Sequence, residues 1–145
     1  MPRNRSLALL ALLTLLSLPG LASAECSLNV VGLTFGSYDP FSVTDTDITG
    51  GVSITCDTDT SAQVSLSAGS GPFAARQLKS GLNALLYNLY ADPAHLSIWG
   101  DGSPGTNLVS FSGTAGSYTV YGRIPAGQNV PVGTYGDTIT VTLTF

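Results

Sequence analysis

The chain has 145 residues, of which 10% are charged, and nine acidic residues outnumber five lysines and arginines for a net charge of −4. A surface of this sign repels nucleic acid and anionic lipid, so we expect neither as a partner. Tryptophan, histidine and methionine occur once each, while glycine, serine, threonine and aspartate are abundant, a composition typical of secreted all-β proteins.

The first residues have the pattern of a secretory signal peptide. Two arginines precede an apolar run over residues 7–18, and Ala22-Ser23-Ala24 has the small-x-small form of a signal-peptidase site. The apolar run is shorter than the roughly 20 residues that a spanning helix needs, so we expect no direct membrane insertion. The sequence predicts a signal peptide at residues 1–24 and a single domain at residues 25–145.

The two cysteines, Cys26 and Cys56, stand at the head of the first strand candidate and at the end of the second. An even number of cysteines in an exported chain favours a disulfide formed in an oxidising compartment. A metal or redox pair is disfavoured, because the Cys-x-x-Cys spacing is missing and only His95 is present to help. We therefore predict a structural disulfide.

Six segments have the β-branched, alternating or apolar pattern of strands and are separated by stretches rich in Gly, Pro, Ser and Asp. They are residues 27–35, 51–56, 62–67, 85–90, 117–124 and 138–145. Residues 76–91 also fit helical spacing, but Gly81 weakens a continuous helix and the second half favours a strand. Short strands at this spacing predict an all-β sandwich with Greek-key connections, one strand short of the seven of an immunoglobulin-like domain.

The last predicted strand has one apolar face and no visible protection. Residues 138–145 alternate threonine with Ile139, Val141, Leu143 and Phe145, so these four side chains share one face. Edge strands are usually blunted by charge, proline or a bulge, and none of these devices is present in the segment. A strand from another molecule is therefore a candidate neighbour.

We find no pattern that predicts an enzyme, a cofactor or a metal site. Asp45 with Asp47, and Asp57 with Asp59, have the one-apart spacing of calcium loops but no glutamate at the twelfth position, so solvated turn aspartates are favoured and weak calcium binding stays open. A Gly-x-Ser-x-Gly elbow is missing, and His95 is expected to be an exposed loop residue.

Three aromatic residues and one ion pair are further candidates. Trp99, Tyr118 and Tyr121 can stack on a sugar, although packing in the core or at an edge is the favoured interpretation. Arg123 and Asp137 stand on either side of the loop before the last strand and can pair across it, which would be structural.

Six motifs, in order along residues 25–145, resemble the spore coat protein U family. They are Phe35-Gly36-Ser37-Tyr38-Asp39-Pro40, Gly51-Val52-Ser53-Ile54-Thr55-Cys56, Tyr87-Asn88-Leu89-Tyr90, Trp99-Gly100-Asp101-Gly102, Tyr121-Gly122-Arg123-Ile124-Pro125 and Gly133-Thr134-Tyr135-Gly136-Asp137-Thr138. The family includes subunits of archaic chaperone-usher pili and secreted coat proteins.

The resemblance implies an incomplete immunoglobulin-like β-sandwich that lacks its final strand and is open between the first and last strands. In such pili a periplasmic chaperone lends a strand to this groove, and an extension of the neighbouring subunit later replaces it. Carried over to this chain, the strand-acceptor groove is walled by Leu28, Val30, Leu33 and Phe35 on one side and by Ile139, Val141, Leu143 and Phe145 on the other. Val30-Val31-Gly32 breaks the alternation of the first wall, as a bulge does.

We therefore expect a structural subunit of a chaperone-usher pilus or surface coat, exported through the periplasm and either displayed at the cell surface or secreted. The partners implied are a periplasmic chaperone, an outer-membrane usher and neighbouring pilin subunits. Only Glu25 separates the expected cleavage site from Cys26, which implies a terminal subunit, whereas another cleavage site would leave part of the leader as a donor strand. The alternative is an adhesin-type module that recognises a surface or carbohydrate ligand through loops including residues 99–105.

Overall fold

A computed structural model describes residues 23–145, and residues 1–22, which hold most of the predicted signal peptide, lie outside this part. Within it the chain forms six β-strands and one 3-10 turn. The elements are β1 (Cys26–Val31), β2 (Thr46–Leu66), η1 (Phe73–Ala75), β3 (Arg76–Ser80), β4 (Asn83–Tyr90), β5 (Val109–Ile124) and β6 (Val141–Thr144). Across residues 23–145 the structure contains no helix that is long and apolar enough to cross a membrane.

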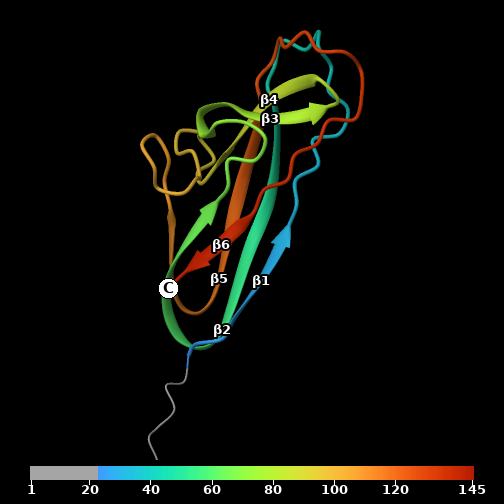
Figure 1. Cartoon of the computed structure of the whole chain (residues 1–145). Helices are drawn as coiled ribbons and strands as arrows, with labels where there is room; N and C mark the ends of the chain where they lie inside the picture. Colours follow the sequence, from blue (N-terminus) through green and yellow to red (C-terminus); the bar gives the residue numbers. More distant parts are fainter. Residues whose placement is uncertain (1–22) are drawn as a thin grey trace, which may run out of the picture.

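The two long strands, β2 and β5, form the frame of the molecule. They pair antiparallel along most of their length, and the register shifts between Thr55 and Thr60 of β2. Near this shift the two strands bend over together, so that each contributes to both layers of the structure (Figure 1). One layer has the order β1-β2-β5-β4-β3, and in the other the second half of β2 lies between β5 and β6.

The core lies between the two layers. Val52 and Ile54 from the first half of β2, and Val64 and Leu66 from the second half, are at most 2% exposed. Alternate residues of both halves point inward, as the two-residue period of a strand requires. Trp99 fills the centre with no exposed surface, and its indole Nε1 donates a hydrogen bond of 3.0 Å to the carbonyl of Val64.

The all-β, immunoglobulin-like fold and the disulfide are confirmed. Cys26 and Cys56 are bonded to each other and are register partners at the end of the β1–β2 pair. Two boundary predictions are wrong: the first strand ends at Val31 rather than at residue 35, and the last forms only over Val141–Thr144 rather than over 138–145. Residues 117–124 are the second half of a strand that begins at Val109.

The predicted strands at 51–56 and 62–67 are one continuous strand, β2. The Asp- and Thr-rich stretch between them has the composition of a turn, but it forms the bend of the strand, because both halves keep the same partner, β5. The sequence also missed β3, in which the buried Arg76 and Leu78 alternate with Gln77 and Lys79. Because arginine is normally a surface residue, a hydrophobicity pattern does not show that Arg76 and Leu78 share the buried face of the strand.

Candidate strand-binding groove

Two segments from opposite ends of the domain border an open channel. β1 stands at one end of its sheet, so one of its edges is unpaired within residues 23–145. The chain then continues past Val31 without joining the ladder of β2 as far as Thr46. On the other side, Gly136 exchanges hydrogen bonds with Lys79, and the chain proceeds through Thr140 into β6, which pairs with β2.

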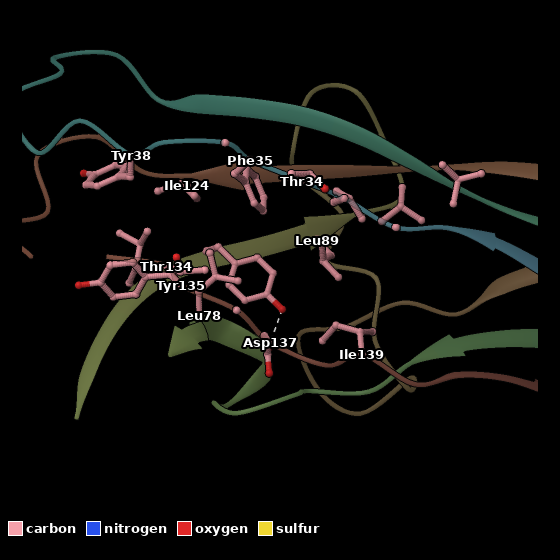
Figure 2. Close-up of a pocket in the computed structure, with 18 of the residues that line it drawn as sticks. Thr34, Phe35, Tyr38, Leu78, Leu89, Ile124, Thr134, Tyr135, Asp137 and Ile139 are labelled. Carbon is pink, nitrogen blue, oxygen red and sulfur yellow. Dashed lines mark hydrogen bonds between the residues drawn. The ribbon is translucent and has the colours of Figure 1, made fainter. Parts of the chain in front are cut away.

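A cavity of about 520 Å³ lies between these segments. Its floor is the buried core, including Val52, Leu66, Leu85, Leu89 and Val120, each at most 3% exposed. Figure 2 shows side chains from both borders directed into the same space, with Phe35 and Tyr38 on one side and Tyr135 and Ile139 on the other. A cavity between the unpaired edge of β1 and the segment that leads into β6 is a candidate site for one further strand.

The eight residues predicted to wall the groove divide into two sets. Five line the cavity, namely Val30, Leu33, Phe35, Ile139 and Val141. The other three, Leu28, Leu143 and Phe145, are not among the residues that line it; Leu28 is 39% and Phe145 69% exposed. The lining also contains residues that the sequence analysis did not single out, above all Tyr38, Leu78, Tyr87, Tyr135 and Asp137.

Two glycines within the long strands position the first wall. A Cβ atom at Gly50 would lie 2.6 Å from the carbonyl oxygen of Val31, and one at Gly122 would lie 2.5 Å from Leu33 Cδ2 and 2.8 Å from Phe35 Cζ. Glycine within a strand often marks a place where another segment approaches closely. These two positions were therefore a signal in the sequence that the segment after β1 crosses over the sheet.

The second wall is fastened by the carboxylate of Asp137. Its Oδ2 accepts a hydrogen bond of 2.7 Å from the hydroxyl of Tyr87, drawn as the dashed line in Figure 2, and its Oδ1 accepts bonds from the backbone and side chain of Ser70. Burial and the bond to Asp137 raise the pKa of the Tyr87 hydroxyl. The Tyr87 ring meets Phe35 edge-on at 6.0 Å, so this cluster spans both walls.

The buried Arg76 connects the segments that surround this cluster. It has no exposed surface, and its guanidinium donates to the carbonyls of Ser67 and Trp99 and to Asn88 Oδ1, at distances of 2.7–3.1 Å. Burial lowers the pKa of the guanidinium. The side chain therefore ties β3, β4, the end of β2 and the Trp99 loop into one unit.

The predicted pairing of Arg123 with Asp137 is wrong. Arg123 binds the carboxylate of Asp47 with two bonds of 2.7 Å and lies 3.3 Å from Asp45 Oδ2, because β2 and β5 bring these residues side by side. His95 is not an exposed loop residue either. Its side chain is 9% exposed, lies 3.8 Å from Asp47 Oδ1 and meets the Tyr90 ring edge-on at 5.1 Å.

Two of the three aromatic candidates for sugar stacking, Trp99 and Tyr118, pack in or against the core, and Tyr121 meets the ring of His95 edge-on at 6.3 Å. The buried Trp99 cannot present its ring to a ligand, and Tyr118 meets that ring edge-on at 6.5 Å while its hydroxyl donates to the carbonyl of Ser110. Packing, the favoured interpretation for Trp99, is thus confirmed. Residues 99–105 form a turn-rich loop, in which Asp101 accepts a hydrogen bond from the backbone of Ser103.

The fold and the groove define a class of protein: an immunoglobulin-like sandwich that is one strand short and has a cavity beside its core. The chain belongs to the Spore Coat Protein U domain family, whose sequence model matches residues 13–142. It is 40% identical over 128 residues to Protein U of Myxococcus xanthus, an alignment that covers 78% of this chain and 71% of that protein.

A solved structure shares the fold. The chain is similar, with a TM-score of 0.63 and 23% identity, to a chain in the crystal structure of the CsuC–CsuE chaperone–tip adhesion subunit pre-assembly complex from archaic chaperone-usher Csu pili of Acinetobacter baumannii. The match covers 85% of this chain and 40% of that chain, so this protein corresponds to less than half of its structural relative.

Proposed function

We propose that the protein is a secreted structural subunit of a chaperone-usher pilus or a surface coat, and that its groove accepts a β-strand from a periplasmic chaperone or a neighbouring subunit. The observation that carries the proposal is the apolar cavity of about 520 Å³ between two separated strand edges. Membership of the Spore Coat Protein U domain family supports it, as does the fold shared with a chain of a chaperone–subunit complex.

The energy at stake explains why such a subunit needs a partner. Four or five apolar side chains of an added strand, each contributing about 2 kcal/mol on burial, would stabilise the domain by about 8–10 kcal/mol. That figure is comparable to the whole stability of a typical domain. The free subunit is therefore marginally stable, and its yield in the periplasm depends on a strand supplied from outside.

The test is to express residues 1–145 for periplasmic export, alone and with a pilus-type chaperone, and to measure soluble yield, copurification and melting temperature. Val30 and Leu28 offer a matched pair, because both are apolar, partly exposed residues of β1 and only Val30 lines the cavity. Val30→Asp should reduce copurification with the chaperone by at least about tenfold, since it places a charge in an apolar interface, and Leu28→Asp should reduce it far less. A stable monomer that neither needs nor binds a strand would refute the proposal.

The position in an assembly is a finer proposal. Cleavage after Ala24 would leave Glu25 ahead of Cys26, and Glu25 is held by two hydrogen bonds to Asp57. We propose a terminal subunit or a coat protein that accepts a strand and gives none, delivered through an outer-membrane usher if it joins a pilus. Mass spectrometry of the exported protein tests this, because a mature N-terminus well upstream of Glu25 would supply a donor segment.

An adhesive role for the loops is a second proposal, in which Trp99 has no part. Phe41, Val43 and Val132 lie in loops and are each at least 90% exposed. Exposed apolar side chains of this kind favour contact with a surface. Replacing all three by serine should abolish adhesion and leave the melting temperature unchanged, whereas unchanged adhesion would dismiss this role.

A further inference from the structure

The lining of the groove contains a single charged residue. Of the residues that border the cavity, Asp137 alone is acidic or basic, and the rest are apolar, aromatic, glycine or hydroxyl residues. Asp137 is partly exposed and borders both the groove and a second hollow that Ser67 and Ser70 also line. An added strand would cover the side of Asp137 that borders the groove.

The carboxylate is locked in one orientation. Oδ1 accepts hydrogen bonds from Ser70 N, Ser70 Oγ and Thr138 N at 3.0, 2.7 and 2.9 Å. Oδ2 accepts one bond, from Tyr87. Gly69, at φ +67°, packs against the group so closely that a Cβ there would overlap Oδ2. The group therefore cannot swing out of the groove when a strand enters.

Covering this carboxylate with an apolar side chain is costly. A carboxylate oxygen can accept two hydrogen bonds, and Oδ2 receives only one from the residues described. Within residues 23–145 Asp137 forms no ion pair, so an apolar strand would remove water from the carboxylate and leave it only the four hydrogen bonds that it already accepts. A hydroxyl, amide or ammonium group on the strand would satisfy the free position and form a charge-assisted hydrogen bond.

We infer that the strand which fills this groove presents a hydrogen-bond donor to Asp137, and that this contact fixes the register of the strand. The inference rests on the proposed function, since it specifies the partner of the same groove. Side chains of a strand that face one way repeat every two residues, so a slip by two would bury the donor among apolar side chains and leave Asp137 without it. In coiled coils, one polar residue in the apolar seam specifies the register of the helices.

The experiment joins a synthetic strand to Phe145 through a short Gly-Ser linker, so that it can turn back along β6 and lie against β1. The strand has roughly nine residues, the length of the wall from Val30 to Tyr38, with valine at every groove-facing position. Each valine in turn is replaced by threonine, which has nearly the same shape and adds a hydroxyl. The measurement is the melting temperature of each fusion.

We expect threonine to lower the melting temperature by about 3–6 °C at every groove-facing position except one, where it raises or preserves it. Asp137→Asn should abolish the exception, since the neutral amide is a weaker acceptor. Tyr87→Phe should increase the benefit of threonine at that position, because it removes the hydrogen bond to Oδ2 while keeping the ring. This variant replaces Asp137→Asn as the test if Asp137→Asn does not fold. A lower melting temperature for threonine than for valine at every position would overturn the inference and leave the proposed function intact. Fusions no more stable than the unfused chain would instead refute the proposed function.

Discussion

Replacing Arg76 tests whether one buried cation holds the base of the groove together. Arg76→Met keeps the length and most of the volume of the side chain but removes every donor. The carbonyls of Ser67 and Trp99 would then lose their side-chain donor, and the amide oxygen of Asn88 would keep only the backbone N–H of Leu89. The ring of Phe73, 5.2 Å from the guanidinium carbon, would lose a cation.

The expected loss follows from these contacts. Each of the three acceptors left without the guanidinium costs about 1 kcal/mol at the low end of the usual range, and the cation–π contact contributes about 1 kcal/mol. The free energy of unfolding should therefore fall by about 4 kcal/mol. Arg76→Lys is the matched control: it keeps the charge but reaches fewer acceptors from one point, so it should lose about half as much.

The assay is urea unfolding of disulfide-intact residues 25–145 with the linked all-valine strand filling the groove, followed by the fluorescence of Trp99, which is the only tryptophan and is fully buried. A shift of the midpoint with an unchanged slope reports a change in stability alone. If Arg76→Met came within about 1 kcal/mol of the parent, or proved more stable than Arg76→Lys, the cost of burying the charge would outweigh its hydrogen bonds. Arg76 would then not stabilise the base of the groove.

Two further substitutions test the wall and the surface. Gly69→Ala and Gly81→Ala both place a side chain at positive φ, but only the first meets Asp137, so it should destabilise by about 1–3 kcal/mol more in the same urea assay, and equal losses would argue against the locked carboxylate. Arg123 holds the pKa of the Asp47 carboxyl below its usual value, so the stability from this pair is present above about pH 4 and is lost as pH falls through the folded-state pKa. The parent should have a free energy of unfolding higher than that of Asp47→Asn by less than about 1 kcal/mol, because Asp47 is exposed, and this difference should vanish in urea titrations toward pH 2. A difference that grows as the pH falls would contradict the prediction.

The framework of the groove could be predicted from residues whose pattern is local. The alternation of Ile139 and Val141 and the disulfide of Cys26 and Cys56 are visible in the sequence, because period and cysteine count do not depend on distant partners. Where the alternation continues past the cavity, the predicted wall is longer than the lining. Leu143 follows the pattern of Val141 but does not line the cavity, since only the path of the chain decides where a face stops being covered.

The polar parts of the groove could not be predicted, because each depends on a partner far away in the chain. Asp137 meets Tyr87 and Ser70 at separations of 50 and 67 residues, and its alternative partner Arg123 was nearer in sequence. Arg76 has the composition of a surface residue and becomes a core residue only because backbone carbonyls surround it. Sequence patterns report apolar faces well and report buried polar networks poorly.

The position of the disulfide makes β1 resistant to a force that pulls on the chain ahead of Cys26. The bond joins the first residue of β1 to its register partner in β2, so tension applied to the chain ahead of Cys26 reaches the covalent link before it reaches any hydrogen bond of β1. β1 therefore cannot be peeled from that end one rung at a time, and the load passes directly into the longest strand of the molecule. The border of the channel thus keeps its shape under a pull that would unzip an unbridged strand.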